Sequence, residues 1–173
     1  MKKLIFLLSI TITVISSQAQ SPFELGGEYL MPMGKGFRNT IAGARGESFS
    51  NKNSFSIGLT YHFSSAKSYS TSKGFGIYAG YRYALSNNVN GNNPFLGARV
   101  LIHMENFDGK TNLNSFFITP FAEAGYHFMF AKSFYAAPSL GYGYSIKLTK
   151  EYNSLDEDVG KRFIPSLSAG YRF

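Results

Sequence analysis

The sequence contains no cysteine and no tryptophan among its 173 residues, and only 16% of them are charged. Without cysteine, the chain has no disulfide, no thiolate zinc site, no cysteine nucleophile and no lipid anchor on cysteine. The charged fraction lies well below the roughly 25% that is usual in soluble domains. Aromatic residues, at 17%, exclude intrinsic disorder, because disordered chains are poor in aromatics and rich in charge. The composition favours a β-rich protein with much of its aromatic surface out of water.

Long apolar runs are also missing. After Ser21 no stretch reaches 18 uncharged apolar residues, so no transmembrane helix is predicted. The first 19 residues have a lysine pair, an apolar run of 12 residues at 4–15, and small residues at Ser17 and Ala19. A run of 12 is too short to span a bilayer, which needs roughly 20 residues, and the three features together are typical of a secretory signal peptide. We therefore predict a cleaved signal peptide at 1–19 and one mature domain at 20–173.

The chain is basic without a basic cluster. Removing Lys2 and Lys3 with the signal peptide lowers the basic residues from 17 to 15, against 10 acidic ones, and the net charge from +7 to +5. The basic residues of the mature chain are spread singly except for the pair Lys161-Arg162. This spread argues against nucleic acid as a partner. A weak attraction to anionic lipid head groups is the better interpretation.

The mature chain alternates between apolar residues and small or polar residues with a period of two, which predicts strands with two different faces. The predicted strands are about 23–33, 54–63, 74–85, 94–105, 115–129, 134–149 and 162–173. Pro120, Pro138 and Pro165 fall on the apolar face of the late strands and should each cause a bulge or a missing hydrogen bond.

A soluble β-sandwich and a membrane barrel share this alternation. Three features favour the barrel. The strands run about 10 to 13 residues, whereas soluble strands average about 5 to 6. The less apolar face is rich in Gly and Ser, as a narrow interior requires. Aromatic residues gather at the strand ends, where the interfacial girdles of membrane barrels lie.

Seven strands are one too few, because bacterial single-chain barrels close with an even number. Short inner turns and longer outer loops place the missing strand between 33 and 54. We predict it at about 39–49, where the alternation is poor. The outer loops then fall at 64–73, 106–114 and 150–161, and the inner turns at 86–93 and 131–133. The predicted fold is all-β: an eight-stranded antiparallel up-and-down transmembrane β-barrel.

Several segments resemble a known family. The last strand, RFIPSLSAGYRF, resembles the C-terminal signature by which the barrel-assembly machinery recognises outer-membrane barrels. The segments GFGIYAGYRYAL and PFAEAGYHFMFAKSFYAAPSLGYGYS look like hairpins of small outer-membrane β-barrel domain proteins of the Bacteroidetes type, similar to outer-membrane proteins W, X and A. The resemblance implies a Gram-negative outer-membrane location, outer-membrane lipid as surroundings, and passage past periplasmic chaperones to the assembly machinery, with Tyr171 and Phe173 in the assembly signal. It does not imply one activity.

Strand parity places seven charged residues inside the barrel. This lumen charge network comprises Glu24, Glu28, Arg82, Arg99, Glu123, Lys147 and Arg172. Charges held out of water must pair, so the network is expected to plug an interior just wide enough for side chains. The alternative is a charged constriction that selects ions.

Catalytic and metal-binding patterns are weak. His62 and His103 fall near the outer rim and His127 near the inner rim, and no pair has helical or hairpin spacing, so no metal site is predicted. Ser86-Asn87 superficially resembles the His-x-Ser-Asn segment of the lipid A deacylases, but Ala84 stands where that family has its histidine. Without a base beside the serine, no catalytic residue and no cofactor are expected.

The sequence thus leaves three functions open. The favoured one is a non-enzymatic structural or surface-interaction barrel, acting through its outer loops as a monomer. The second is a narrow channel for small solutes. The third, which has least support, is a lipid A-modifying enzyme.

Overall fold

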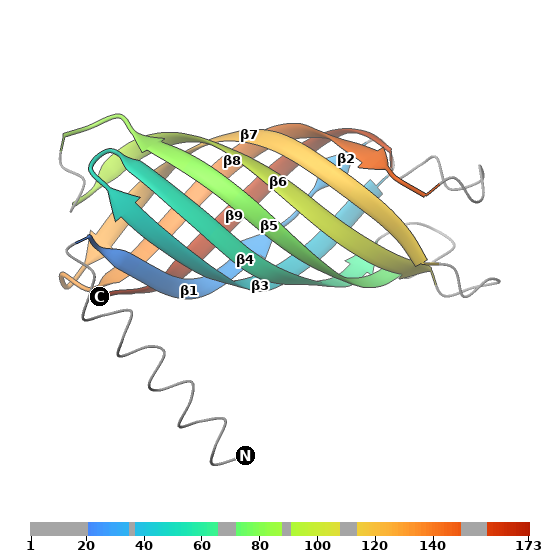
Figure 1. Cartoon of the computed structure of the whole chain (residues 1–173), viewed down its shortest axis with the longest axis horizontal. Coiled ribbons are helices and arrows are strands. Elements are labelled where there is room, and N and C mark those ends of the chain that lie inside the picture. The colour runs from blue at the N-terminus through green and yellow to red at the C-terminus, as the bar shows by residue number, and fades with distance from the viewer. Residues whose placement is uncertain (1–20, 35–36, 66–71, 88–90, 108–113, 150–158) are drawn as a thin grey trace, which may run out of the picture.

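The computed structural model describes residues 21–34, 37–65, 72–87, 91–107, 114–149 and 159–173. Nine strand segments are present (Figure 1). They are β1 (Phe23–Leu30), β2 (Met33–Gly34), β3 (Phe37–Ser50), β4 (Asn53–Ser65), β5 (Ser72–Ala84), β6 (Asn93–Phe107), β7 (Asn114–Phe130), β8 (Phe134–Lys147) and β9 (Gly160–Arg172). Within these ranges no helix has the length and hydropathy needed to cross a bilayer.

The nine segments form an eight-stranded barrel, because β1 and β2 are one strand interrupted at Met31-Pro32. Both segments pair with β3 on one side and with β9 on the other, in one unbroken register. Pro32 has no N–H to give to the ladder, and the interruption lies opposite Pro165. The pairing on both sides makes β1 and β2 a single strand of the barrel.

The barrel is a closed antiparallel meander. Each strand pairs with its neighbour in sequence, and β1 pairs with β9 to close the sheet. The eight-stranded fold predicted from the sequence is therefore confirmed. The weakly alternating strand predicted at 39–49 exists and is longer, from Phe37 to Ser50.

The connections 51–52, 85–92 and 131–133 lie at one end of the barrel, which we call the turn end. The first two residues after β7, Ala131 and Lys132, have positive φ angles of 47° and 68°. The opposite end, which we call the loop end, is where β2 leads to β3, β4 to β5, β6 to β7 and β8 to β9. The predicted outer loops 64–73, 106–114 and 150–161 contribute their first or last residues to strands, and their remainder lies outside the described residues.

Two of the three prolines interrupt the β7–β8 ladder as predicted. The pairing skips residues 119–120 and 126–127 of β7, next to Pro120 and opposite Pro138, and then resumes in the same register. A register shift occurs elsewhere, between Thr40 and Ile41 of β3. The prolines therefore break hydrogen bonds locally without displacing the strands.

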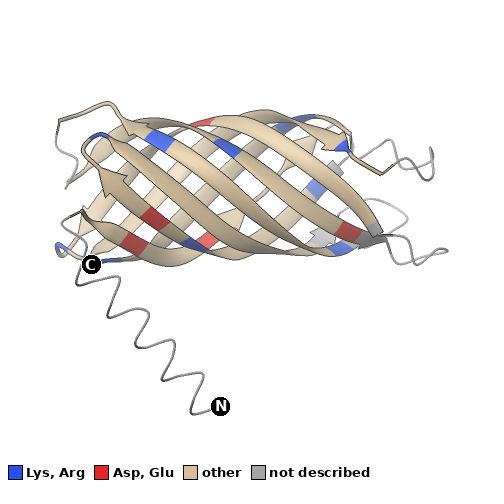
Figure 2. Ribbon diagram, in the orientation of Figure 1, with Lys and Arg blue, Asp and Glu red and all other residues tan. Residues whose placement is uncertain are grey.

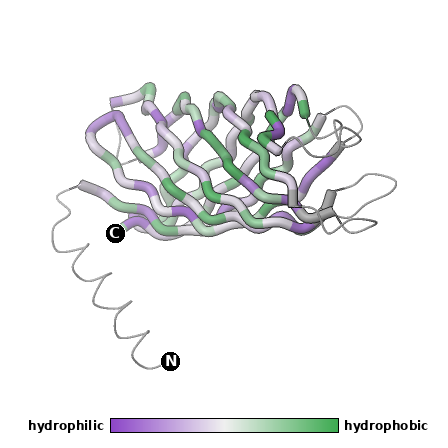
Figure 3. Tube along the Cα trace, turned by 45° about the vertical axis from the view of Figure 1, so that its right-hand side comes forward, coloured by the Kyte–Doolittle hydropathy of each residue, from purple (hydrophilic) through white to green (hydrophobic). Residues whose placement is uncertain are grey.

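The side chains are arranged with apolar groups outside and charged groups inside. Ile57 on the outer face of β4 is 72% exposed, whereas Arg45 inside β3 is 1% exposed. The tube in Figure 3 alternates along most strands between hydrophobic and hydrophilic residues. This arrangement is the one expected of a barrel whose wall faces lipid, and the opposite of a soluble sandwich.

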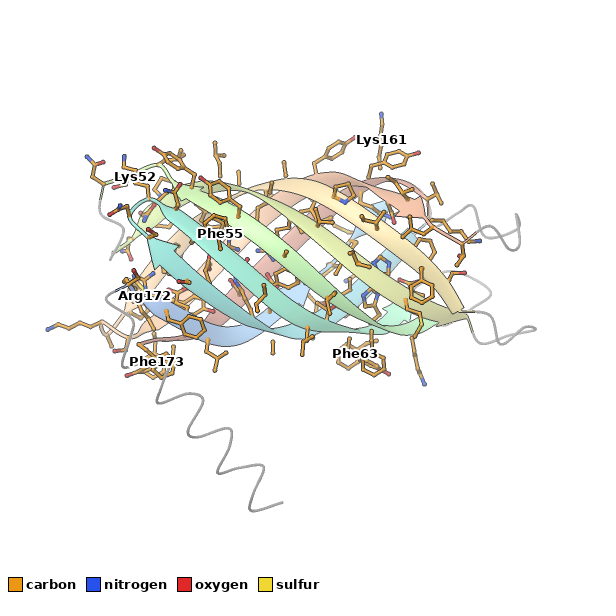
Figure 4. The ribbon with its side chains drawn as sticks, viewed as in Figure 1. Lys52, Phe55, Phe63, Lys161, Arg172 and Phe173 are labelled. Carbon is orange, nitrogen blue, oxygen red and sulfur yellow. The ribbon has the colours of Figure 1, made fainter. Side chains whose placement is uncertain are left out.

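Aromatic side chains lie in contact near both ends of the outer wall. At the loop end the ring centroids of Tyr61 and Phe75 are 4.9 Å apart, and at the turn end those of Phe134 and Tyr171 are 5.4 Å apart. Figure 4 shows Phe63 and Phe173 projecting from the wall at opposite ends. The two groups of rings are placed as interfacial girdles would be.

Candidate functional site: the side-chain-filled lumen

The lumen accommodates large charged side chains because several inward positions are glycine. A Cβ added to Gly97 would lie 3.0 Å from Cγ of Arg82 and 3.2 Å from Cγ of Glu123. A Cβ on Gly58 would collide with the ring of Tyr78. Close packing inside a narrow barrel, rather than a phosphate-binding loop, therefore explains these glycines.

At the centre of the lumen six charged side chains form a closed ring, which we call the central ring. In order around the ring, the members are Glu28, Arg45, Glu47, Arg82, Glu123 and Arg99. The N–O distances along the first five links are 3.3, 2.6, 3.4, 2.9 and 2.9 Å. A hydrogen bond from Arg99 to Glu28 closes the ring. Carboxylates and guanidiniums alternate, so the six formal charges cancel.

The central ring is buried and held from several sides. It links β1, β3, β5, β6 and β7, strands that are not all neighbours in the sheet (Figure 2). Ser54 donates to Glu47 at 2.6 Å and Ser139 donates to Glu123 at 2.9 Å. The Arg82 guanidinium lies 4.2 Å from the centroid of the Phe95 ring. Because removing one member of a buried ion pair leaves an uncompensated charge, each member depends on the others.

A second charged group lies at the turn end. Glu24 Oε1 accepts hydrogen bonds from Arg172 Nε at 2.8 Å and lies 2.8 Å from His127 Nε2. The guanidinium of Arg172 stands 4.5 Å from the Phe49 ring centroid. This group ties the first strand to the last, where the barrel closes.

Apolar side chains separate the charged groups along the barrel. The buried cluster on the loop side of the central ring comprises Leu30, Ile41, Tyr78, Leu101, Phe121 and Ile164. On the turn side, Phe95, Tyr135 and Ala137 pack together. Two lumen cavities, one near each end, have volumes of about 20 Å³ each. Each has room for about one water, which needs at least roughly 10–15 Å³.

At the loop end, His62, His103 and Glu105 come together; we call these three residues the loop-end triad. Glu105 Oε1 lies 3.0 Å from His62 Nδ1 and 3.3 Å from His103 Nε2. Asn39 donates to the same oxygen at 2.9 Å. The two imidazoles stack with centroids 4.6 Å apart, and Phe117 stacks on the other side of His103.

The seven residues predicted for the lumen network all have the inward parity, and the structure distributes them over the length of the barrel. Glu28, Arg82, Arg99 and Glu123 join the central ring. Glu24 and Arg172 form the turn-end group instead. Lys147 is half-buried at the end of β8 and lies eight residues beyond Ser139, the part of β8 that reaches the ring.

Two members of the central ring, Arg45 and Glu47, were not predicted. They lie on β3, whose outward residues include Ala42, Ala44 and Gly46. Small outward residues made the two faces of this strand hard to distinguish. Once β3 is assigned, its inward parity identifies both charges.

His62 and His103, both predicted near the outer rim, lie in contact although their spacing gave no sign of it. They lie on β4 and β6, on either side of β5, and they pair with Gly74 and Gly76 of β5. Because glycine has no side chain, the two imidazoles meet over the backbone of the strand between them. Spacing within one hairpin could not reveal a contact across an intervening strand.

The third histidine and the serine considered as a nucleophile both lie near the turn end. His127 contacts Glu24 there, as its predicted inner-rim position requires. Ser86 is the second residue after the end of β5. His62 and His103 are at the other end of the barrel.

Comparison with solved structures relates the fold to outer-membrane barrels. The N-terminal β-barrel domain of Pseudomonas aeruginosa OprF is similar, with a TM-score of 0.63 and 16% identity over 90% of this chain and 100% of that one. Neisserial surface protein A (NspA) is similar with a TM-score of 0.61 and 17% identity, over 89% of this chain and 96% of that one. The Pseudomonas aeruginosa outer membrane protein OprG is similar with a TM-score of 0.52 and 12% identity, over 88% of this chain and 96% of that one. No family model and no curated protein matches the sequence. At these identities the likeness establishes the closed eight-stranded barrel fold.

Proposed function

We propose that the chain is an integral outer-membrane barrel whose lumen is plugged, and that it acts as a structural or surface-interaction protein, without enzymatic activity. The neutral central ring is the observation that supports this proposal. It crosses the middle of the lumen, apolar side chains lie on both sides of it, and the end cavities are water-sized. A conducting path would need a continuous polar bore.

The proposed location rests on the outer wall and on the N-terminal sequence. The wall exposes large apolar side chains along the strands, and the rings near both ends suit the two interfaces of a bilayer. Residues 1–19 are proposed to direct export and to be cleaved. Tyr171 and Phe173, which project outward at the end of the chain, are proposed to engage the barrel-assembly machinery after the chain leaves periplasmic chaperones.

Interaction with surface partners is proposed to reside in the segments 64–73, 106–114 and 150–161. A variant with all three segments replaced by short Gly-Ser linkers should still fold. Adhesion of cells carrying this variant to a protein-coated surface should fall to the level of cells without the protein. Equal adhesion of wild type and variant would remove the surface-interaction role.

Single-channel recording in a planar bilayer tests the plug. The refolded mature protein should insert without stable conductance steps. The second candidate, a narrow channel past the same six charged side chains, predicts uniform steps whose ion selectivity changes in Arg99→Gln. Lys161→Gln, at an exposed position on β9, is the matched control and should leave selectivity unchanged.

A further inference from the structure

The loop-end triad has the composition of a metal site. Two imidazoles and one carboxylate supply nitrogen and oxygen ligands, and their ligand atoms all lie within 4.8 Å of one another. Three such protein ligands with one open position are the set that binds zinc in non-structural sites. We propose that His62, His103 and Glu105 bind one Zn²⁺ ion at the loop end of the lumen.

The distances between the ligand atoms suit a tetrahedral ion. Bonds of about 2.0–2.1 Å to Zn²⁺ place tetrahedral ligand atoms about 3.3–3.4 Å apart. Glu105 Oε1 lies 3.0 Å from His62 Nδ1 and 3.3 Å from His103 Nε2. The imidazole planes are stacked and 29° apart, so binding requires at least one ring to rotate out of the stack before both lone pairs aim at one point.

A second observation points to a ligand at this place. Glu105 is 1% exposed, yet Oε2 of its carboxylate has no hydrogen-bond partner. Unpartnered buried polar atoms carry a desolvation cost that a bound ion with its water would offset. The cavity of about 20 Å³ lined by His103, Glu105 and Asn39 has room for that water as the fourth ligand.

Neighbouring groups hold the ligands in place. Thr40 N donates to Asn39 Oδ1 at 2.9 Å, and this contact fixes the amide so that Nδ2 donates to Glu105 Oε1 at 2.9 Å. Phe117 stacks on His103 with an interplanar angle of 14°. Such outer contacts orient ligands in metal sites and raise their affinity.

One nearby charge opposes a cation. Arg162 lines the same cavity as His103 and Glu105, while its Nη1 donates to the Lys161 carbonyl oxygen at 3.3 Å. Electrostatic repulsion from this guanidinium should weaken zinc binding. Replacing it with a neutral residue should therefore tighten binding, a result that a purely structural role for the triad would not give.

The test uses the full mature chain, refolded in detergent without a histidine tag. Titration calorimetry with Zn²⁺ should show one ion bound per chain. His103→Gln and Glu105→Gln should each weaken binding on the order of 100-fold or more, because losing a ligand exceeds the 10–100-fold effect of losing an outer contact. Arg162→Gln should bind more tightly than wild type.

His127→Gln is the matched control, because His127 is also buried and also lies against a glutamate, but at the turn end. It should bind Zn²⁺ like wild type. Co²⁺ added to wild type should give intense tetrahedral visible bands that Zn²⁺ abolishes, a readout that needs no variant. Absence of Zn²⁺ binding, octahedral Co²⁺ bands, or equal binding by folded His103→Gln would each overturn the proposal.

Discussion

Arg82 and Arg99 share a single carboxylate oxygen. Each donates through Nε to Glu123 Oε1 at 2.9 Å, from the neighbouring strands β5 and β6. Two guanidiniums that converge on one oxygen are held together only while that oxygen is charged. Glu123 is thus the anion on which two cations of the central ring depend.

Neutralising Glu123 should therefore be costly. Glu123→Gln leaves two buried guanidiniums without their shared anion, and we expect it to lower the free energy of unfolding by about 3–5 kcal/mol. Urea titration followed by circular dichroism and by the heat-dependent gel shift measures the change. Ser139→Ala removes the hydrogen bonds of Ser139 Oγ with Glu123 Oε2 and with Ser166 Oγ, and should cost about 1 kcal/mol for each. Equal costs for the two variants would contradict a coupled ring.

A methyl group inside the lumen should disturb the ring where the same group outside is tolerated. In Gly97→Ala the new Cβ would lie 2.8 Å from the Tyr81 carbonyl oxygen as well as near Arg82 and Glu123, so we expect a loss of about 1–3 kcal/mol from overpacking. Gly27→Ala on the outer face is the control, since the nearest atom to its Cβ would be the Gly43 carbonyl oxygen, 3.9 Å away. The comparison fails if both variants unfold at the same urea concentration.

Charge on the outer wall should be penalised according to depth. Ile77 lies near the middle of β5 and is 55% exposed, whereas Leu85 lies just beyond the turn end of the same strand. If the wall faces lipid, Ile77→Arg should cost about 2–4 kcal/mol and Leu85→Arg about 0–1 kcal/mol when the protein is folded into lipid vesicles. A wall that faces water would tolerate both substitutions equally.

The last residue should matter more for assembly in the cell than for stability. Phe173 and Phe134 are each 57% exposed, and the ring of each packs against the ring of Tyr171. Phe173→Ala should reduce the amount of heat-modifiable barrel in the cell envelope, while Phe134→Ala should not. Both purified variants should refold equally well into detergent. Equal assembly of the two in cells would argue against Phe173 as part of the recognition signal.

The sequence predicted the wall better than the interior. Alternation locates a strand and its faces, so the seven predicted strands agree with the structure to within two residues at each end, and connection lengths supply the eighth. Parity also placed Glu28, Arg82, Arg99 and Glu123 inside the barrel. Side-chain contacts across the lumen depend on which strands face each other and on how far along the barrel axis each side chain lies. The alternation of residues along the sequence gives neither.

The loop-end triad illustrates the limit most clearly. His62 and Glu105 are 43 residues apart and lie on strands separated by β5. Their contact depends on Gly74 and Gly76 leaving the space above β5 open. With the register known, the two glycines opposite two histidines would have been a usable signal.

The backbone N–H of Phe173 donates to the carbonyl oxygen of Phe23 at 2.9 Å, so the first residue of β1 and the final residue of the chain bond to each other. Until residues 160–173 arrive, β1 and β8 each have an open hydrogen-bonding edge, which is the feature of a sheet that invites pairing with other chains. Because β9 pairs with both β1 and β8, neither edge can be covered before β9 is made. The risk of aggregation therefore persists until β9 has joined the sheet.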